Sequence, residues 1–300
     1  MNREYLHYDV FTSDPLLGNQ LAVFTDARGL DTAAMQKIAR EMNYPESTFL
    51  LPAEQTDTDV RMRIFTPFVE MPIAGHPTIG STFALEELGR ISAGASRVVF
   101  GLNVGPVPVD LEWRDGRLAF AWMTQALPEF GPVVEDRRTV AETLGLAIDD
   151  LAERPIQRVS CGVPFLYVPL RDPAAVDRAA PDASACRKLA AATGLSLPLF
   201  VFAPAERRDG VFVAHSRMFA PEFGITEDPA TGIASGPLGS YLVHYGIAEA
   251  GSPARIESHQ GVVMGRPSRI SIAISGTRGN ITDVKVGGEA VLVGRGELLL

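Results

Sequence analysis

The chain has 300 residues, of which 46% are hydrophobic and 21% are charged, and its formal net charge is -9. This length favours two domains of about 150 residues each. The acidic balance excludes a concentrated basic surface, so we expect neither a nucleic-acid nor a membrane partner. Two cysteines are too few for a secreted disulfide framework, and no run of about 18 apolar residues occurs, which together favour a cytoplasmic protein.

The first half of the chain contains several strand patterns and two helical patterns. Strands are predicted at residues 5–12, 20–25, 47–52 and 59–66, with two or three more within 97–123. A helix is predicted at residues 31–43, with Asp31 as its N-cap. A second helix is predicted at residues 77–89, with Pro77 at the first helical position and Gly89 at its end.

The second half begins after a segment rich in proline and glycine, residues 126–136, which we expect to connect the domains. Helices are predicted at residues 137–146 and 232–245. Strands are predicted at residues 163–170, 198–203, 211–218, 269–274, 281–287 and 290–299. The mixture predicts an α+β fold with antiparallel meanders. We place one domain at residues 1–127 and the other at 128–300, with the last strand, about 288–300, able to cross back into the first.

An internal repeat links the two halves. The block Arg63-x-Phe65-x-Pro67 recurs as Arg217-x-Phe219-x-Pro221, and each block precedes a glycine at the start of a predicted helix. A weaker match pairs residues 18–23 with residues 162–167 at nearly the same offset. Chance agreement among common strand residues is the alternative, but two matches in the same order favour duplicated domains. Equivalent loops could then face one cleft.

Two equivalent loops carry the first candidate site residues. One contains Gly75-His76 and the other contains Asp228 and Gly232. Glycine lets a ligand approach the backbone, and a helix N-terminus offers unpaired N–H groups and partial positive charge. Two such N-termini would bind a carboxylate, or stabilise the negative charge that forms when the adjacent carbon loses a proton. Ordinary turn geometry explains either glycine alone, whereas the pair favours a binding site.

Three side chains could take part in proton transfer or substrate binding. His76 could bind substrate or relay a proton, although a helix cap is the alternative. Asp228 precedes a proline and could instead cap the following turn. Glu46 stands directly before an apolar strand and could act as a general acid–base, although the residues alone favour a solvated carboxylate at the strand end. No metal-ligand spacing and no phosphate or dinucleotide loop occurs, so we expect no metal and no cofactor.

Taken together, these residues resemble the PhzF-like isomerases of phenazine biosynthesis. The resemblance spans nearly the whole chain and lies in residues 9–23, 63–80, 228–232 and 260–268. It implies the diaminopimelate-epimerase-like fold, in which two pseudo-twofold-related domains each curl a mostly antiparallel sheet around a central helix. It also implies a homodimer that needs no cofactor.

The resemblance assigns roles to individual residues. It implies that Glu46 is the acid–base residue, that His76 and Asp228 are catalytic, and that Gly75 and Gly232 supply backbone donors. Ser47 and Ile233 are then expected to lie at the substrate.

Two positions depart from the family pattern. Pro45 replaces the usual serine before the glutamate, and Ile233 replaces a serine after the second glycine. Ile233 adds apolar bulk and cannot donate a side-chain hydrogen bond, which leaves the substrate open. Because Cys161 and Cys186 lie outside the two loops, a two-thiol racemase mechanism is disfavoured.

The sequence thus predicts a cofactor-independent isomerase that shifts a proton on a small carboxylate, cyclic ones included. The alternatives are an epimerase or racemase on the same fold, and a catalytically silent protein that only binds ligand.

Overall fold

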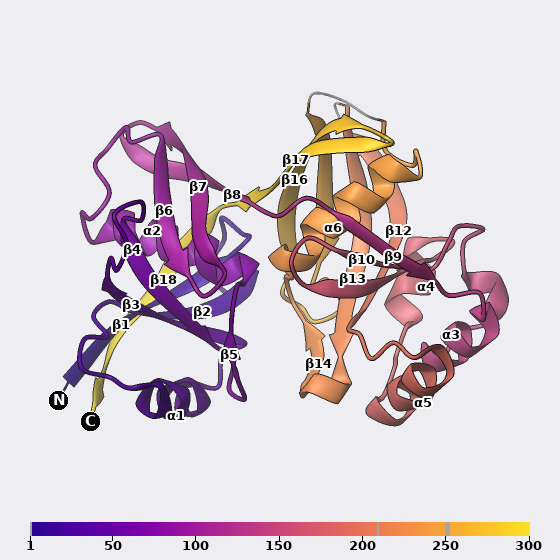
Figure 1. The fold of residues 1–300 in the computed structure, drawn as a ribbon, viewed down its shortest axis with the longest axis horizontal. Coiled ribbons are helices and arrows are strands. Elements are labelled where there is room, and N and C mark those ends of the chain that lie inside the picture. The colour runs from indigo at the N-terminus through magenta and orange to yellow at the C-terminus, as the bar shows by residue number, and fades with distance from the viewer. Residues whose placement is uncertain (1, 209, 250–252) are drawn as a thin grey trace. The chain divides into compact units, whose positions relative to one another are not determined.

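The computed structural model describes residues 2–208, 210–249 and 253–300. The chain forms two compact units (Figure 1). Unit 1 comprises the chain up to Thr124 together with Val286–Leu300, and unit 2 comprises Gln125–Lys285. Each unit combines curled strands with a few helices, so the predicted α+β class is confirmed. Within the described residues, no helix is long and apolar enough to cross a membrane.

Unit 1 contains ten strands or helices from the first part of the chain and one strand from its end. These are β1 (Asn2–Val10), β2 (Asn19–Phe24), α1 (Thr32–Met42), β3 (Glu46–Pro52), β4 (Val60–Phe65), β5 (Glu70–Met71), α2 (Gly75–Glu87), β6 (Arg97–Leu102), β7 (Gly105–Arg114), β8 (Arg117–Thr124) and β18 (Ala290–Leu299). The strands follow the order β18–β1–β2–β3–β4–β6–β7–β8. Pairing is parallel at β2–β3 and β4–β6 and antiparallel elsewhere in that order.

Unit 2 repeats this arrangement with a longer helical insertion. Its elements are β9 (Glu129–Val133), α3 (Arg137–Thr143), β10 (Gln157–Ser160), β11 (Pro164–Pro169), α4 (Pro173–Arg178), α5 (Ala183–Thr193), β12 (Leu199–Arg208), β13 (Val211–Ala220), β14 (Ile225–Asp228), α6 (Gly232–His244), β15 (Ala254–Gln260), β16 (Ser268–Thr277) and β17 (Asn280–Gly288), whose last residues belong to unit 1. The order is β9–β10–β11–β12–β13–β15–β16, and pairing is parallel at β11–β12 and β13–β15. Parallel pairs therefore occur at the same two places in both units.

The strand register defines which positions of the two units are equivalent. Phe65 pairs with Ser47, and its repeat partner Phe219 pairs with Leu199. Ser47 and Leu199 therefore occupy equivalent positions. One residue earlier, Glu46 of unit 1 corresponds to Pro198 of unit 2.

The repeated arginine forms the same contacts in both units. Arg63 donates from Nε and Nη2 to the Glu70 carboxylate over 2.8 and 2.6 Å, and Arg217 donates likewise to Glu227 over 2.9 and 2.8 Å. Each guanidinium also lies over the ring of the phenylalanine two residues on. The repeated motif is thus a bidentate link between a long strand and the short strand that follows it.

The two central helices are α2 and α6, each 13 residues long. α2 lies among the strands of unit 1 and α6 among those of unit 2 (Figure 1). Nearly every residue of either helix is buried, because small and apolar residues predominate in both and their buried hydroxyls bond to the backbone or to Thr48 of β3. Glycine permits close packing on both: a Cβ at Gly80 would lie 2.6 Å from Leu21, and one at Gly239 would lie 2.5 Å from Ile272.

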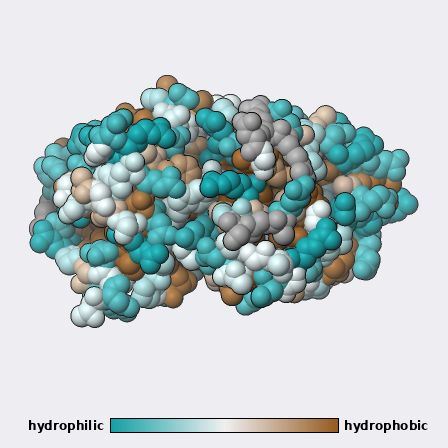
Figure 2. All heavy atoms as spheres, turned by 90° about the horizontal axis from the view of Figure 1, so that it is seen from above, coloured by the Kyte–Doolittle hydropathy of each residue, from teal (hydrophilic) through white to brown (hydrophobic). Residues whose placement is uncertain are grey.

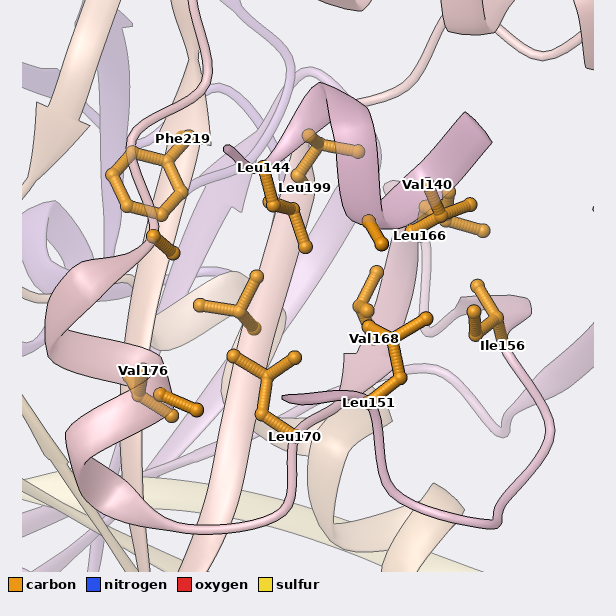
Figure 3. Packing of buried hydrophobic residues seen from close by; sticks show 14 of the residues in the cluster. Val140, Leu144, Leu151, Ile156, Leu166, Val168, Leu170, Val176, Leu199 and Phe219 are labelled. Carbon is orange, nitrogen blue, oxygen red and sulfur yellow. The ribbon is translucent and has the colours of Figure 1, made fainter. Parts of the chain in front are cut away.

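Separate apolar clusters support the smaller helices. In unit 1, α1 buries Met35 and Ile38 against Phe24, Phe49 and Phe65. In unit 2, α3, α4 and α5 pack on the β11–β12 strands through the cluster in Figure 3. On the face shown in Figure 2, hydrophilic side chains predominate and apolar ones are scattered, as on most folded proteins.

Several local predictions were wrong. Residues 126–136 were expected to connect the domains, but they include the strand β9. Pro132 does not prevent the strand, because it lies where the β9–β10 register shifts and proline is tolerated at such irregularities. The helix predicted from residue 77 begins at Gly75, so Pro77 is its third residue. The helix predicted at residues 137–146 ends at Thr143. The two helices α4 and α5 and the strand β15 were not predicted.

Candidate active site

Unit 1 brings Glu46 and His76 together. Glu46 is the first residue of β3, and its carboxylate oxygen Oε2 lies 3.3 Å from His76 Nδ1 at the start of α2. Asn19, at the start of β2, places its amide Nδ2 3.3 Å from the same nitrogen. The Glu46 side chain is 13% exposed and the His76 side chain 4%. These three side chains form a polar group at the point where two strand ends meet a helix N-terminus.

The imidazole of His76 is neutral over the ordinary pH range. Burial lowers its pKa to about 3, and a hydrogen bond with the Gln20 backbone opposes this shift only in part. The contact of 3.3 Å with Glu46 therefore joins a carboxyl group to an uncharged ring and is not an ion pair. Since Nδ1 carries either one proton or one lone pair, the tautomer of His76 and the protonation of Glu46 are coupled.

The backbone around His76 adds two donors. Gly75 and His76 occupy the first two positions of α2, where helical N–H groups have no acceptor within the helix. No side chain caps this end, because the N-cap residue is Ala74. Ser47, next to Glu46, is fully buried, and its Oγ has no hydrogen-bond partner among the described residues. The first turn of α2 can thus present two N–H groups to an anion.

Unit 2 holds Asp228 in a separate network. Thr231 Oγ1 donates to Asp228 Oδ2 over 2.5 Å. Gln260 Nε2 in turn donates to Thr231 Oγ1 over 2.9 Å and to the Asp228 backbone carbonyl over 2.7 Å. All three side chains are buried, and Gln260 is fully so. Thr231 and Gln260 were not among the predicted site residues, although both lie in segments that carry the family resemblance, residues 228–232 and 260–268.

Gly232 and Ile233 occupy the first two positions of α6. They match Gly75 and His76 of α2, so the second helix also presents two N–H groups without helical acceptors. The Gly232 carbonyl accepts a hydrogen bond of 3.0 Å from Gln125 Nε2. Ile233 is 8% exposed. The predicted residues thus fall into two groups, one in each unit.

Neither cysteine has the properties of a reactive thiol. Cys161 and Cys186 are both buried. Burial raises the pKa of Cys161 to about 12 and that of Cys186 to about 11. Both thiols are therefore protonated at neutral pH, when a nucleophile or base would need the thiolate. Within the described ranges, no group of three or more His, Cys, Asp or Glu side chains is placed to hold a metal ion.

The chain is similar to known proteins over its whole length. The chain is 37% identical over 303 residues to an uncharacterized isomerase of Mesorhizobium japonicum, with 99% of each chain covered. It is also 37% identical over 297 residues to the trans-2,3-dihydro-3-hydroxyanthranilate isomerase of Pseudomonas fluorescens, again with 99% of each covered. The crystal structure of the Bacillus anthracis phenazine biosynthesis protein of the PhzF family superposes with a TM-score of 0.90, at 27% identity and 100% coverage of both chains.

The fold and these relatives define an enzyme of the isomerase class. The model of the phenazine biosynthesis-like protein family, PhzC-PhzF, matches residues 8–296. The chain belongs to that family, so the predicted resemblance is confirmed.

Proposed function

We propose that the protein is a cofactor-independent isomerase that moves a proton between two carbons of a small carboxylate, with Glu46 as the general acid–base. The observation that supports this most is the contact of 3.3 Å between the Glu46 carboxylate and a neutral, buried His76. Glu46 takes the proton from one carbon of a conjugated system and returns it to another. A second carboxylate or thiol is not needed for such a shift.

His76 serves this reaction as a hydrogen-bond partner. Its pKa of about 3 means that it does not become a cation when Glu46 holds the substrate proton. The proton therefore stays on Glu46 between removal and return. The fixed imidazole limits the rotation of the Glu46 carboxylate, which favours return of the proton within one bound complex.

The remaining predicted residues bind the substrate in this proposal. The N–H groups of Gly75 and Gly232 hold the carboxylate or the enolate-like charge that develops beside it. Asp228 accepts a hydrogen bond from an amino or hydroxyl group of the substrate. Because relatives carry the name trans-2,3-dihydro-3-hydroxyanthranilate isomerase, that compound is the first substrate to test. Because Ile233 adds an apolar side chain, analogues of that compound with an apolar group in place of a polar one are the second substrates to test.

The direct test is Glu46→Gln, which keeps the shape of the side chain and removes its proton-transfer capacity. We expect kcat to fall by about 10²- to 10⁴-fold on a substrate that the wild type converts. Glu54→Gln is the matched control, since Glu54 is 67% exposed and pairs with Arg61. A fall below about tenfold would remove Glu46 from the mechanism.

The same assay in D2O separates the proposal from its rivals. Isomerisation gives a shifted double bond, and the receiving carbon gains the substrate's own hydrogen, with solvent deuterium there only in the fraction that exchanges on Glu46 before the proton returns. Deuterium incorporated at one stereocentre with inversion would instead identify an epimerase. Binding of the compound without conversion or exchange, across cyclic and acyclic acids, would identify a silent binding protein.

A further inference from the structure

The end of β15 and the residues that follow it hold the loop that carries Asp228. Gln260 uses both ends of its amide on this loop: Nε2 donates to the Asp228 carbonyl and to Thr231 Oγ1, and Oε1 accepts from the Thr231 backbone N–H over 3.1 Å. Gln260 is fully buried, so these bonds replace all the water that the amide would otherwise bind. The family-like block around residues 260–268 thus has a definite structural role.

Two further residues of the block fix the middle of the loop. Gly261 has φ +74°, and a Cβ there would lie 2.6 Å from the Pro229 carbonyl oxygen. Only glycine allows that approach together with that backbone conformation. Ser268 Oγ donates to the same Pro229 carbonyl over 2.6 Å. The loop from Asp228 to Thr231 is therefore held at Asp228, Pro229 and Thr231, which are three of its four residues.

The hydrogen bonds can run in only one direction. An amide nitrogen donates and never accepts, so Thr231 Oγ1 must accept from Gln260. The single hydroxyl proton of Thr231 is then left for Asp228 Oδ2. Because the acceptor is a carboxylate, this bond is of the stronger, charge-assisted kind. Gln260 thus determines, through Thr231, which hydroxyl proton the Asp228 oxygen Oδ2 accepts.

The fold itself does not need this network. By strand register and by the repeated glutamate and glycine, the equivalent positions of unit 1 are Met71, Ala74 and Leu102. Unit 1 makes the same strand–helix connection with these three apolar side chains. Buried polar groups cost free energy unless they are fully paired. A polar network that occurs in unit 2 and has no counterpart in unit 1 therefore points to a purpose beyond folding.

We propose that Gln260 and Thr231 are positioning residues that orient the Asp228 carboxylate toward the substrate. The inference rests on the proposed function in one respect, that Asp228 contacts the substrate. Neither residue touches the substrate; each acts through Asp228. Replacing either side chain with an apolar one leaves the fold intact and lets the Asp228 carboxylate rotate.

The first experiment needs no substrate. Crystal structures of Thr231→Val, Thr231→Ser and Gln260→Leu are compared with that of the wild type. We expect the Asp228 carboxylate to rotate in Thr231→Val and Gln260→Leu and to keep its orientation in Thr231→Ser, which retains the hydroxyl. Ser258→Ala is the control. Ser258 lies on the same strand as Gln260, and the substitution removes its buried hydrogen bond to Ser216. An unrotated carboxylate in both Thr231→Val and Gln260→Leu would overturn the proposal.

The second experiment measures isomerisation of trans-2,3-dihydro-3-hydroxyanthranilate. Loss of one hydrogen bond to a charged group predicts a fall of about 10- to 100-fold in kcat/KM for Thr231→Val, with recovery in Thr231→Ser. In an Asp228→Ala background, Gln260→Leu should add less than about threefold, because its effect passes through the missing carboxylate. Full additivity would show a merely structural role. A wild type inactive on this compound would count against the proposed function, while the crystallographic comparison would still decide the orientation.

Discussion

Units 1 and 2 share a topology, but the polar side chains of the candidate site occupy different positions of the repeated fold in each unit. Unit 1 has Asn19, Glu46 and His76 where unit 2 has Val163, Pro198 and Ile233. Unit 2 has Asp228, Thr231 and Gln260 where unit 1 has Met71, Ala74 and Leu102. At the positions equivalent to each polar group, the other unit has apolar residues.

The difference separates what the fold requires from what the site requires. The arginine–glutamate link occurs in both units, so it belongs to the fold. The glycine at the start of the central helix also occurs in both, and in the proposed function each of the two glycines donates a backbone N–H to the substrate. The two polar groups occur once each. Since an unpaired buried polar group costs about 1–3 kcal/mol, a duplicated domain tends to lose such groups where no function retains them. In the proposed function, the group retained in unit 1 supplies the acid–base residue, and the group retained in unit 2 supplies a carboxylate that binds the substrate.

The shared arginine gives the largest expected difference in stability. Arg217 is 8% exposed and donates to three backbone carbonyls at the end of α4 as well as to Glu227, whereas Arg63 is 18% exposed. Arg217→Met leaves a buried carboxylate without its partner and should cost about 3–5 kcal/mol. Arg63→Met should cost about 1–2 kcal/mol, because Asn103 still donates to Glu70.

Calorimetric unfolding of the two arginine variants, at equal protein concentration, gives the measurement. Equal losses would show that burial of the shared link does not distinguish the units.

The glycines within the central helices should give smaller and nearly equal effects. A Cβ at Gly80 or at Gly239 would lie within 2.7 Å of a side-chain methyl or methylene group of the surrounding strands. Gly80→Ala and Gly239→Ala should each cost about 1–3 kcal/mol through overpacking. Gly94→Ala is not a suitable control, because its φ is +81°. The control is instead Ala84→Gly inside α2, which shows how much of the change in the free energy of unfolding comes from helix propensity. A stabilised Gly80→Ala or Gly239→Ala would contradict the close packing.

The sequence was sufficient to predict the elements that follow strong local rules. The repeated arginine block marked the duplication because the same contacts select the same residue types in both units. Asp31 was recognised as an N-cap, and its side chain accepts from Ala34 N–H as the rule requires. The helices α4 and α5 also begin after capping aspartates, Asp172 and Asp182, but their short, alanine-rich turns show little apolar periodicity.

The site was harder to predict because its residues are distant in the sequence. Glu46 gained its role only from the family resemblance, since its contact with His76 depends on how β3 and α2 pack. Gln260 lies far along the chain from Thr231, and only the parallel pairing of β13 with β15 brings that strand beside the loop. Local patterns report propensity and burial, and they do not report such tertiary contacts.

His76 gives the smallest predicted effect, and one that should be confined to unit 1. Its pKa rises from about 3 in the folded state to about 6.5 in the unfolded state, so between these values only the unfolded chain binds the proton. Stability contributed by neutral His76 is therefore full above pH 6.5 and declines as the pH falls toward 3. At pH 5.5 the loss should be about 1 kcal/mol relative to pH 7.5.

Amide exchange, corrected for intrinsic rates, can locate this loss. At pH 5.5 we expect α2 to lose protection while α6, which has Ile233 at the equivalent position, keeps it. His76→Gln should abolish the pH-dependent part in α2 because it cannot bind the proton. Equal loosening of both helices, or an unchanged decline in His76→Gln, would show that the two units differ in some group other than this histidine.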